Sequence, residues 1–127
     1  MNQGKIKSFT QLDTWKFGHQ LVLDIYKITR KFPREELFGL TNQLRRAIIS
    51  FTSNIAEGFS RKSYKEKCQF YSMALGSLSE VQNQLLIARD IGYIEKSEFK
   101  ELAEKTVVIS KLTNGLIKKT NTIIHNS

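Results

Sequence analysis

The sequence contains 127 residues, of which 40% are hydrophobic, and this size suits a single domain with a substantial core. Its one cysteine, Cys68, excludes an intrachain disulfide and a classical cysteine metal site. No apolar run is long enough for a signal peptide or a membrane span, so we expect a soluble cytoplasmic protein without membrane contacts. A net charge of +8 and a pI of about 9.7 favour anionic partners such as nucleic acid.

The first two predicted helices lie on either side of Pro33, the only proline. Residues 13–31 form the first, because Asp13 suits a helix N-terminus and the residue before a proline avoids helical angles. The second is expected over residues 36–57, closed by Gly58 in the left-handed conformation. Their inward residues recur at three- and four-residue steps. These are Trp15, Leu21, Val22, Ile25, Ile28 and Phe32, and then Leu40, Leu44, Ala47, Ile48, Phe51, Ile55 and Ala56.

The third and fourth helices are predicted over residues 63–91 and 97–122. Ser63 and Glu66 have capping-box spacing and Gly92 ends the third helix, while Ser97 with Lys100 in place of the usual acid opens the fourth. Short connections place successive helices antiparallel, so residues 1–127 are predicted to form one all-α, up-down-up-down four-helix bundle. The inward residues are Phe70, Ala74, Leu75, Leu78, Val81, Leu85 and Ala88, and then Phe99, Leu102, Val107 or Val108, Ile109, Leu112 and Leu116.

Several short runs, in a fixed order, resemble a known bacterial family. They are Phe32-Pro33, residues 36–40 (ELFGL), residues 43–47 (QLRRA), residues 53–58 (SNIAEG) followed by Arg61, and residues 74–80 (ALGSLSE). Together they resemble the four-helix-bundle proteins named for intervening sequences in 23S ribosomal RNA genes. The resemblance covers nearly the whole chain, from Phe9 to about Lys118.

The resemblance implies an antiparallel four-helix bundle that assembles as a ring, usually a homopentamer. The accessory protein of diversity-generating retroelements is similar in fold, and it is a basic ring that binds nucleic acid and a reverse transcriptase. For most of the family, the activity is unknown.

The polar residues of these runs have structural interpretations. Helix heights place Glu80 near Arg45 and Arg46, which predicts an ion pair between Glu80 and one arginine, most simply fixing the register of the two helices. Asn54 is expected to tie the second helix to the third near Gln69.

Two further residues of the runs sit where a contact is expected. Glu57 is predicted to pair with Arg61. Gly76, in the middle of a helix, indicates either close packing within the bundle or, as we favour, the approach of another subunit.

The sequence offers no catalytic constellation. The two histidines have no companions at metal-ligand spacing, there is no glycine-rich phosphate loop, and no Glu-x-x-His pair suits a di-iron centre. We therefore expect a non-catalytic protein without metal or cofactor.

The positive charge is concentrated at the two ends of the chain. Residues 1–31 hold six basic and two acidic residues, and residues 105–127 hold four basic and none acidic. In the predicted bundle both termini and the turn near residue 60 meet at one end, which predicts a nucleic-acid-binding surface, with RNA favoured over DNA by the family name. The alternative is a homo-oligomeric scaffold that binds a protein partner, with no nucleic-acid role. The candidate contacts are Lys5, Lys7, Lys16, Arg61, Lys62, Lys65, Lys67, Lys118 and Lys119.

Overall fold

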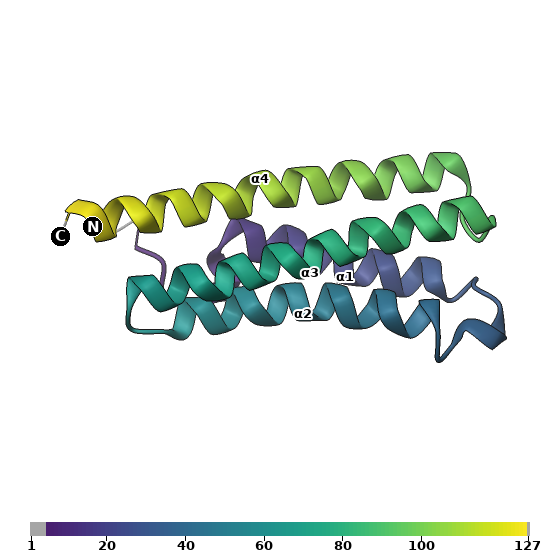
Figure 1. Ribbon diagram of the computed structural model, residues 1–127, viewed down its shortest axis with the longest axis horizontal. Helices are drawn as coiled ribbons and strands as arrows, with labels where there is room; N and C mark the ends of the chain where they lie inside the picture. The colour runs from purple at the N-terminus through teal and green to yellow at the C-terminus, as the bar shows by residue number, and fades with distance from the viewer. Residues whose placement is uncertain (1–4, 127) are drawn as a thin grey trace.

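Four long helices, joined by short connections, form an antiparallel bundle in the computed structural model, which describes residues 5–126 (Figure 1). They are α1 (Asp13–Thr29), α2 (Leu40–Ser60), α3 (Tyr64–Ile91) and α4 (Lys96–Asn126), with 3₁₀ turns η1 (Phe9–Gln11) and η2 (Arg34–Glu36). Both α1 and α3 pack against α2 and α4, so the helices occupy the corners of a square with sequential neighbours adjacent. The predicted all-α, up-down-up-down bundle is confirmed.

The core lies along the axis of the bundle and is built mainly from the residues that the three- and four-residue spacing predicted. Leu21, Leu44, Phe51 and Leu85 are fully enclosed. Trp15 and Val22 pack against this core with part of their surface exposed. Within the described residues, no helix has both the length and the hydropathy needed to cross a membrane.

Two of the predicted helix ends are confirmed in atomic detail. The Ser63 hydroxyl accepts the N–H of Glu66 at 3.2 Å, so it caps α3 at its start. Gly92 ends the same helix with φ +96°, in the left-handed region that favours glycine.

The start of α4 differs from the prediction. Glu98 accepts the backbone N–H of Glu95 through its carboxylate at 3.0 Å, and Ser97 lies inside the first helical turn. The predicted cap by Ser97 and Lys100 is therefore wrong, because the helix begins at Lys96, two residues earlier than a cap by Ser97 would allow.

The connection between α1 and α2 also corrects a prediction. The second helix begins at Leu40, not at residue 36, since Gly39 has φ −110° and ψ −117°, outside the helical region. The Glu36 carboxylate accepts both the Leu40 N–H at 3.1 Å and the Tyr93 hydroxyl at 2.7 Å. Both hydrogen bonds lower the pKa of Glu36 and stabilise its charged form. This residue therefore caps α2 from the preceding loop and fastens that loop to the connection between α3 and α4.

Gly58 does not end α2 as predicted. The helix continues to Ser60, and Gly58 is buried within it in an ordinary helical conformation. A Cβ atom at this position would lie 2.7 Å from Cε1 of Tyr71, so the glycine is needed for the close approach of α3. A glycine is required at position 58, but the requirement comes from packing between α2 and α3 and not from the end of a helix.

Candidate nucleic-acid interface at the basic end of the bundle

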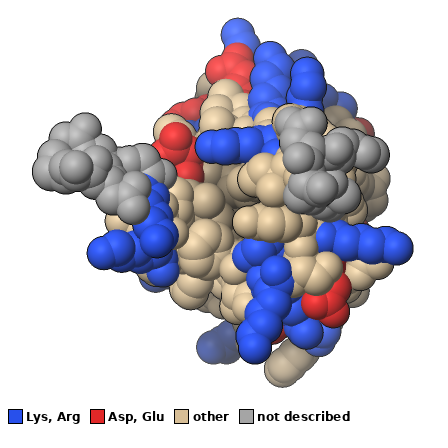
Figure 2. Space-filling view, turned by 90° about the vertical axis from the view of Figure 1, so that its left-hand side faces the viewer, with Lys and Arg blue, Asp and Glu red and all other residues tan. Residues whose placement is uncertain are grey.

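The end of the bundle that holds both chain termini also holds the turn between α2 and α3 (Figure 1). Figure 2 looks directly at this end, where lysine and arginine side chains surround the described surface and acidic side chains are few. The bundle topology thus brings together three basic segments that are far apart in the sequence, as predicted.

Seven of the nine predicted contact residues are exposed lysines. They come from the segment before η1, from α1, from the α2–α3 turn and the start of α3, and from the end of α4. Within the described part of the chain, none of these seven ammonium groups has a hydrogen-bond or ion-pair partner. They are Lys5, Lys7, Lys16, Lys62, Lys65, Lys118 and Lys119.

Arg61 has a structural role at this end. Its guanidinium pairs with the Glu57 carboxylate at 3.1 Å and lies 4.6 Å from the centre of the Phe70 ring. The predicted pair between Glu57 and Arg61 is confirmed. Because Arg61 is held between an acid and an aromatic ring, it contributes less to an anion-binding surface than its sequence position implied.

Lys67 is also turned inward. Its Nζ donates to the backbone carbonyl of Phe59 at 2.5 Å and lies 5.2 Å from the centre of that ring. Burial lowers the pKa of this lysine, since the folded chain shields the ammonium from water. Lys67 thus satisfies a carbonyl in the last turn of α2. Charge and sequence spacing alone could not distinguish it from its exposed neighbours.

Besides Glu57, two acidic residues at this end lie at the starts of helices. Asp13 lies in the first turn of α1 and Glu66 in the first turn of α3, where carboxylates offset the positive end of the helix dipole. The positive charge of this end therefore comes from the lysine side chains, since acidic residues offset the helix N-termini.

The opposite end has a different charge pattern. Lys31 pairs with Glu98 at 3.0 Å and Arg89 with Asp90 at 2.8 Å. The two ends of the bundle are therefore electrostatically distinct, and this asymmetry distinguishes a local basic surface from a general positive excess.

Arg45 and Arg46 point to different neighbours. The Arg45 Nε donates to the Thr29 hydroxyl at 2.9 Å, and its guanidinium lies 4.5 Å from the centre of the Tyr26 ring, so it joins α2 to α1. Arg46 lines a shallow pocket together with Glu80, as the estimated helix heights predicted. The predicted ion pair is wrong, however, because no described lysine or arginine lies within 4.0 Å of the Glu80 carboxylate.

Asn54 makes its hydrogen bonds inside its own helix. Its amide donates to the Ser50 carbonyl at 3.0 Å and lies 3.3 Å from the Ser50 hydroxyl, which in turn bonds the Ser77 hydroxyl at 2.8 Å. The predicted contact near Gln69 is wrong, because the short amide reaches the preceding turn more easily than the next helix. The link between α2 and α3 is carried by the two serines.

Gly76 lies on the outer surface of α3. A Cβ atom added there would meet nothing within 4 Å, so close packing within the bundle does not explain this glycine. Its favoured interpretation, the approach of another subunit, stays a prediction.

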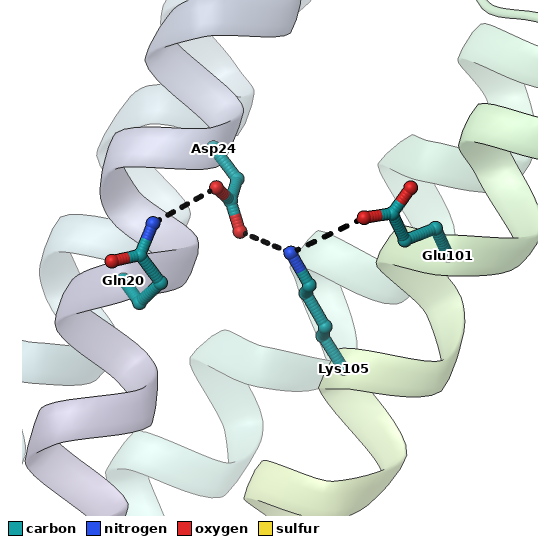
Figure 3. A network of polar contacts seen from close by, with 4 residues as sticks. All are labelled: Gln20, Asp24, Glu101 and Lys105. Atoms are coloured by element: carbon teal, nitrogen blue, oxygen red, sulfur yellow. Dashed lines mark hydrogen bonds and ion pairs between the residues drawn. The ribbon is translucent and has the colours of Figure 1, made fainter.

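A polar network that the sequence analysis missed joins α1 to α4 (Figure 3). Lys105 lies 2.8 Å from the Asp24 carboxylate and 3.6 Å from that of Glu101, and the Gln20 amide donates to Asp24 at 3.1 Å. The hydrogen bond to Asp24 raises the pKa of Lys105 and keeps it charged. One of the four basic residues of the C-terminal segment is therefore neutralised locally and lies outside the basic end.

Among the described residues, no three histidine, cysteine or acidic side chains gather as a metal site would require.

Comparison with known proteins identifies the family. None of the curated proteins matches the chain significantly. A crystal structure of a protein of unknown function from the S23 ribosomal protein family, from Bacteroides thetaiotaomicron VPI-5482, has the same fold, with a TM-score of 0.77 and 20% sequence identity over 83% of this chain and 95% of that one. The model of the family described as 23S rRNA-intervening sequence protein matches residues 10–115, and the chain therefore belongs to this family.

Proposed function

We propose that this protein is a non-catalytic nucleic-acid-binding protein that assembles as a ring of identical copies and presents its basic ends on one rim. The proposal depends chiefly on the seven exposed lysines gathered at one end of the bundle. The ring, with a pentamer as the expected size, follows from the family resemblance. The family name, with its reference to 23S rRNA, favours RNA over DNA.

Binding is expected to depend on phosphate charge and not on base identity. Lysine ammonium groups that neutralise phosphates release counterions, so affinity falls steeply with salt and depends little on sequence. A ring multiplies this effect, because several copies of the surface meet one polyanion at a high effective concentration. The proposed contacts are the seven exposed lysines, while Arg61 and Lys67 stabilise the bundle end beneath them.

The proposal assigns no chemical step to the protein. Its charged groups with shifted pKa values each have a structural partner, as Glu36 has in Tyr93 and Lys105 has in Asp24. These contacts join loops and helices to one another.

The test is fluorescence anisotropy with a labelled structured RNA and a duplex DNA across a salt series. A basic-end variant changes Lys62, Lys65, Lys118 and Lys119 to glutamine. A matched control makes the same charge change at the other end, with glutamine replacing the exposed residues Lys27, Arg30, Arg34 and Lys96.

The wild-type protein is expected to bind both ligands at low salt, with RNA bound more tightly. The basic-end variant should bind more weakly, and the slope of log K against log salt should fall by about 0.9 for each lost phosphate contact. The control variant should resemble the wild type. Equal losses in both variants would show that binding follows total charge. Absence of binding at low salt would remove the nucleic-acid role and favour the alternative, a homo-oligomeric scaffold for a protein partner.

A further inference from the structure

Helix α3 carries large apolar side chains outside its core-facing side. Leu78, Val81 and Leu85 face the core, yet Met73 and Ile91 on its other sides are each 55% exposed. In a single copy of the bundle, α3 has protein on only part of its surface, so these outer apolar side chains are left uncovered.

The outer side of α3 that adjoins α2 forms one candidate contact surface, the α2–α3 face. Met73, Gly76, Glu80 and Ile87 recur at three- and four-residue steps and therefore share one side of the helix over about 21 Å. Glu80 lines a pocket with Arg46 of α2, which places this side against α2. At Gly76 the surface has open space where a side chain would stand, so another backbone can come close.

A second apolar surface, the α1–α4 face, lies over the groove between α1 and α4. Phe17 of α1 and Val108 of α4 are 52% and 47% exposed, and together with Ile109 they line a groove of about 340 Å³. The polar network of Figure 3 lies beside these apolar side chains, in the same groove between α1 and α4. Large apolar side chains that gather on a surface mark an interaction site more often than isolated ones do.

The two faces lie on opposite sides of the molecule and at the same height. They are opposite because α1 and α3 each pack between α2 and α4. Their heights are fixed by the hydrogen bond from Gln82 of α3 to Thr106 of α4, at 3.0 Å. Glu80 precedes Gln82 by two residues and Val108 follows Thr106 by two residues. Because α3 and α4 are antiparallel, both Glu80 and Val108 lie about 3 Å closer to the basic end than this hydrogen bond.

The charges on the two faces are complementary. Glu80 on the α2–α3 face has no cation within 4.0 Å in the described chain. Lys111, exposed on the outer side of α4, lies about one turn beyond Val108 toward the basic end, within side-chain reach of the height of Glu80. Arg46 beside the α2–α3 face and Glu104 in the α1–α4 groove are a second pair of opposite charges on the two faces.

We propose that the α2–α3 face of one copy packs against the α1–α4 face of the next, with all copies pointing in the same direction. Because two different faces meet, the contact is head-to-tail, and it closes into a ring when the rotation between neighbours divides a full turn. This inference rests on the ring in the proposed function and names the surfaces that build it. It also explains how every basic end reaches the same rim.

The experiment measures the mass of the full chain in solution by light scattering after size exclusion, for the wild type and for two variants. Gly76→Trp blocks the α2–α3 face, and an isolated bundle leaves room for the indole side chain at this position. Val108→Asp places a charge in the α1–α4 face at an already exposed position. His19→Asp is the control, since His19 is exposed and lies about 200° around α1 from Phe17. Circular dichroism checks that each variant is folded.

The wild type and His19→Asp are expected to form one defined oligomer, and the two interface variants to be monomers. An equal mixture of the two variants should give a dimer, because each variant keeps the face that the other has lost. A monomeric wild type, an interface variant that retains the wild-type mass, or a mixture that stays monomeric would each overturn the proposal. Loss of nucleic-acid binding by an intact wild-type oligomer would count against the proposed function alone.

Discussion

Replacing Gly58 with alanine tests whether this glycine is required by packing. Alanine is the better helix former, so a Gly→Ala change inside a helix ordinarily stabilises it by about 0.5–1 kcal/mol. At Gly58, however, the new Cβ would lie 2.7 and 2.9 Å from two ring atoms of Tyr71 and 3.0 Å from Cβ of Phe70. Tyr71 is 2% exposed, so its ring lies among the packed side chains of the core.

The two effects can be compared in magnitude. Forcing an extra methyl group into a closely packed contact typically costs about 1–3 kcal/mol. After the gain in helix propensity, we expect a net loss of about 1–2 kcal/mol, which lowers the Tm by about 3–8 °C for a domain of this size. The matched control is Gly115→Ala on α4, where a Cβ would meet nothing within 4 Å. This change should raise the stability by about 0.5–1 kcal/mol.

Urea unfolding followed by circular dichroism measures both variants, at one fixed protein concentration because the proposed assembly would stabilise the folded state by mass action. The two changes should move the midpoint in opposite directions with similar slopes. If Gly58→Ala were as stabilising as Gly115→Ala, the contact with Tyr71 would not control this position. The interpretation of Gly58 as a packing residue would then be wrong.

Three further changes test individual contacts. Thr113→Val removes the partner of the buried Thr14 hydroxyl, 2.6 Å away, and should cost about 1–3 kcal/mol in urea unfolding, with a smaller added cost when Thr14 is changed as well. Tyr93→Phe should destabilise the protein at neutral pH, and the difference from wild type should shrink on acidification, because the lowered pKa of Glu36 gives a stabilisation that is lost as the pH falls through that pKa. Lys105→Gln should cost no more than about 1 kcal/mol, and less at high salt, since its ion pairs are partly exposed and screened.

The fold was predictable because local and global signals agree. The spacing of apolar residues set the four helices, and Ser63 and Gly92 marked the ends of α3 through backbone chemistry that needs no tertiary contact. The bundle topology followed from the short connections. Helix ends that depend on neighbouring elements, such as the start of α2 beside Glu36, could not be placed from the sequence, since the contact to Tyr93 crosses the bundle.

The sequence predicted which end of the bundle is basic, but not which of its lysine and arginine side chains are exposed there. Summing charge along the chain and placing the termini at one end located the lysines correctly. The distinction between Lys62, which is exposed, and Lys67, which bonds the Phe59 carbonyl, depends on where the last turn of α2 leaves an unpaired oxygen. Only the folded structure shows that geometry.

The prediction that Val107 or Val108 faces the core is wrong, because both side chains are 47% exposed. Their exposure bears on the proposed ring. Inward positions of α4 are occupied at seven-residue intervals by Thr106, Thr113 and Thr120, whose hydroxyls donate to carbonyls of the preceding turn. Because these hydrogen bonds satisfy the hydroxyl protons, the threonines are tolerated on the same inward side as Leu102 and Ile109. The valines are then turned outward, where a single bundle leaves them half exposed. A neighbouring copy that covers them would account for apolar residues outside and polar residues inside on the same helix.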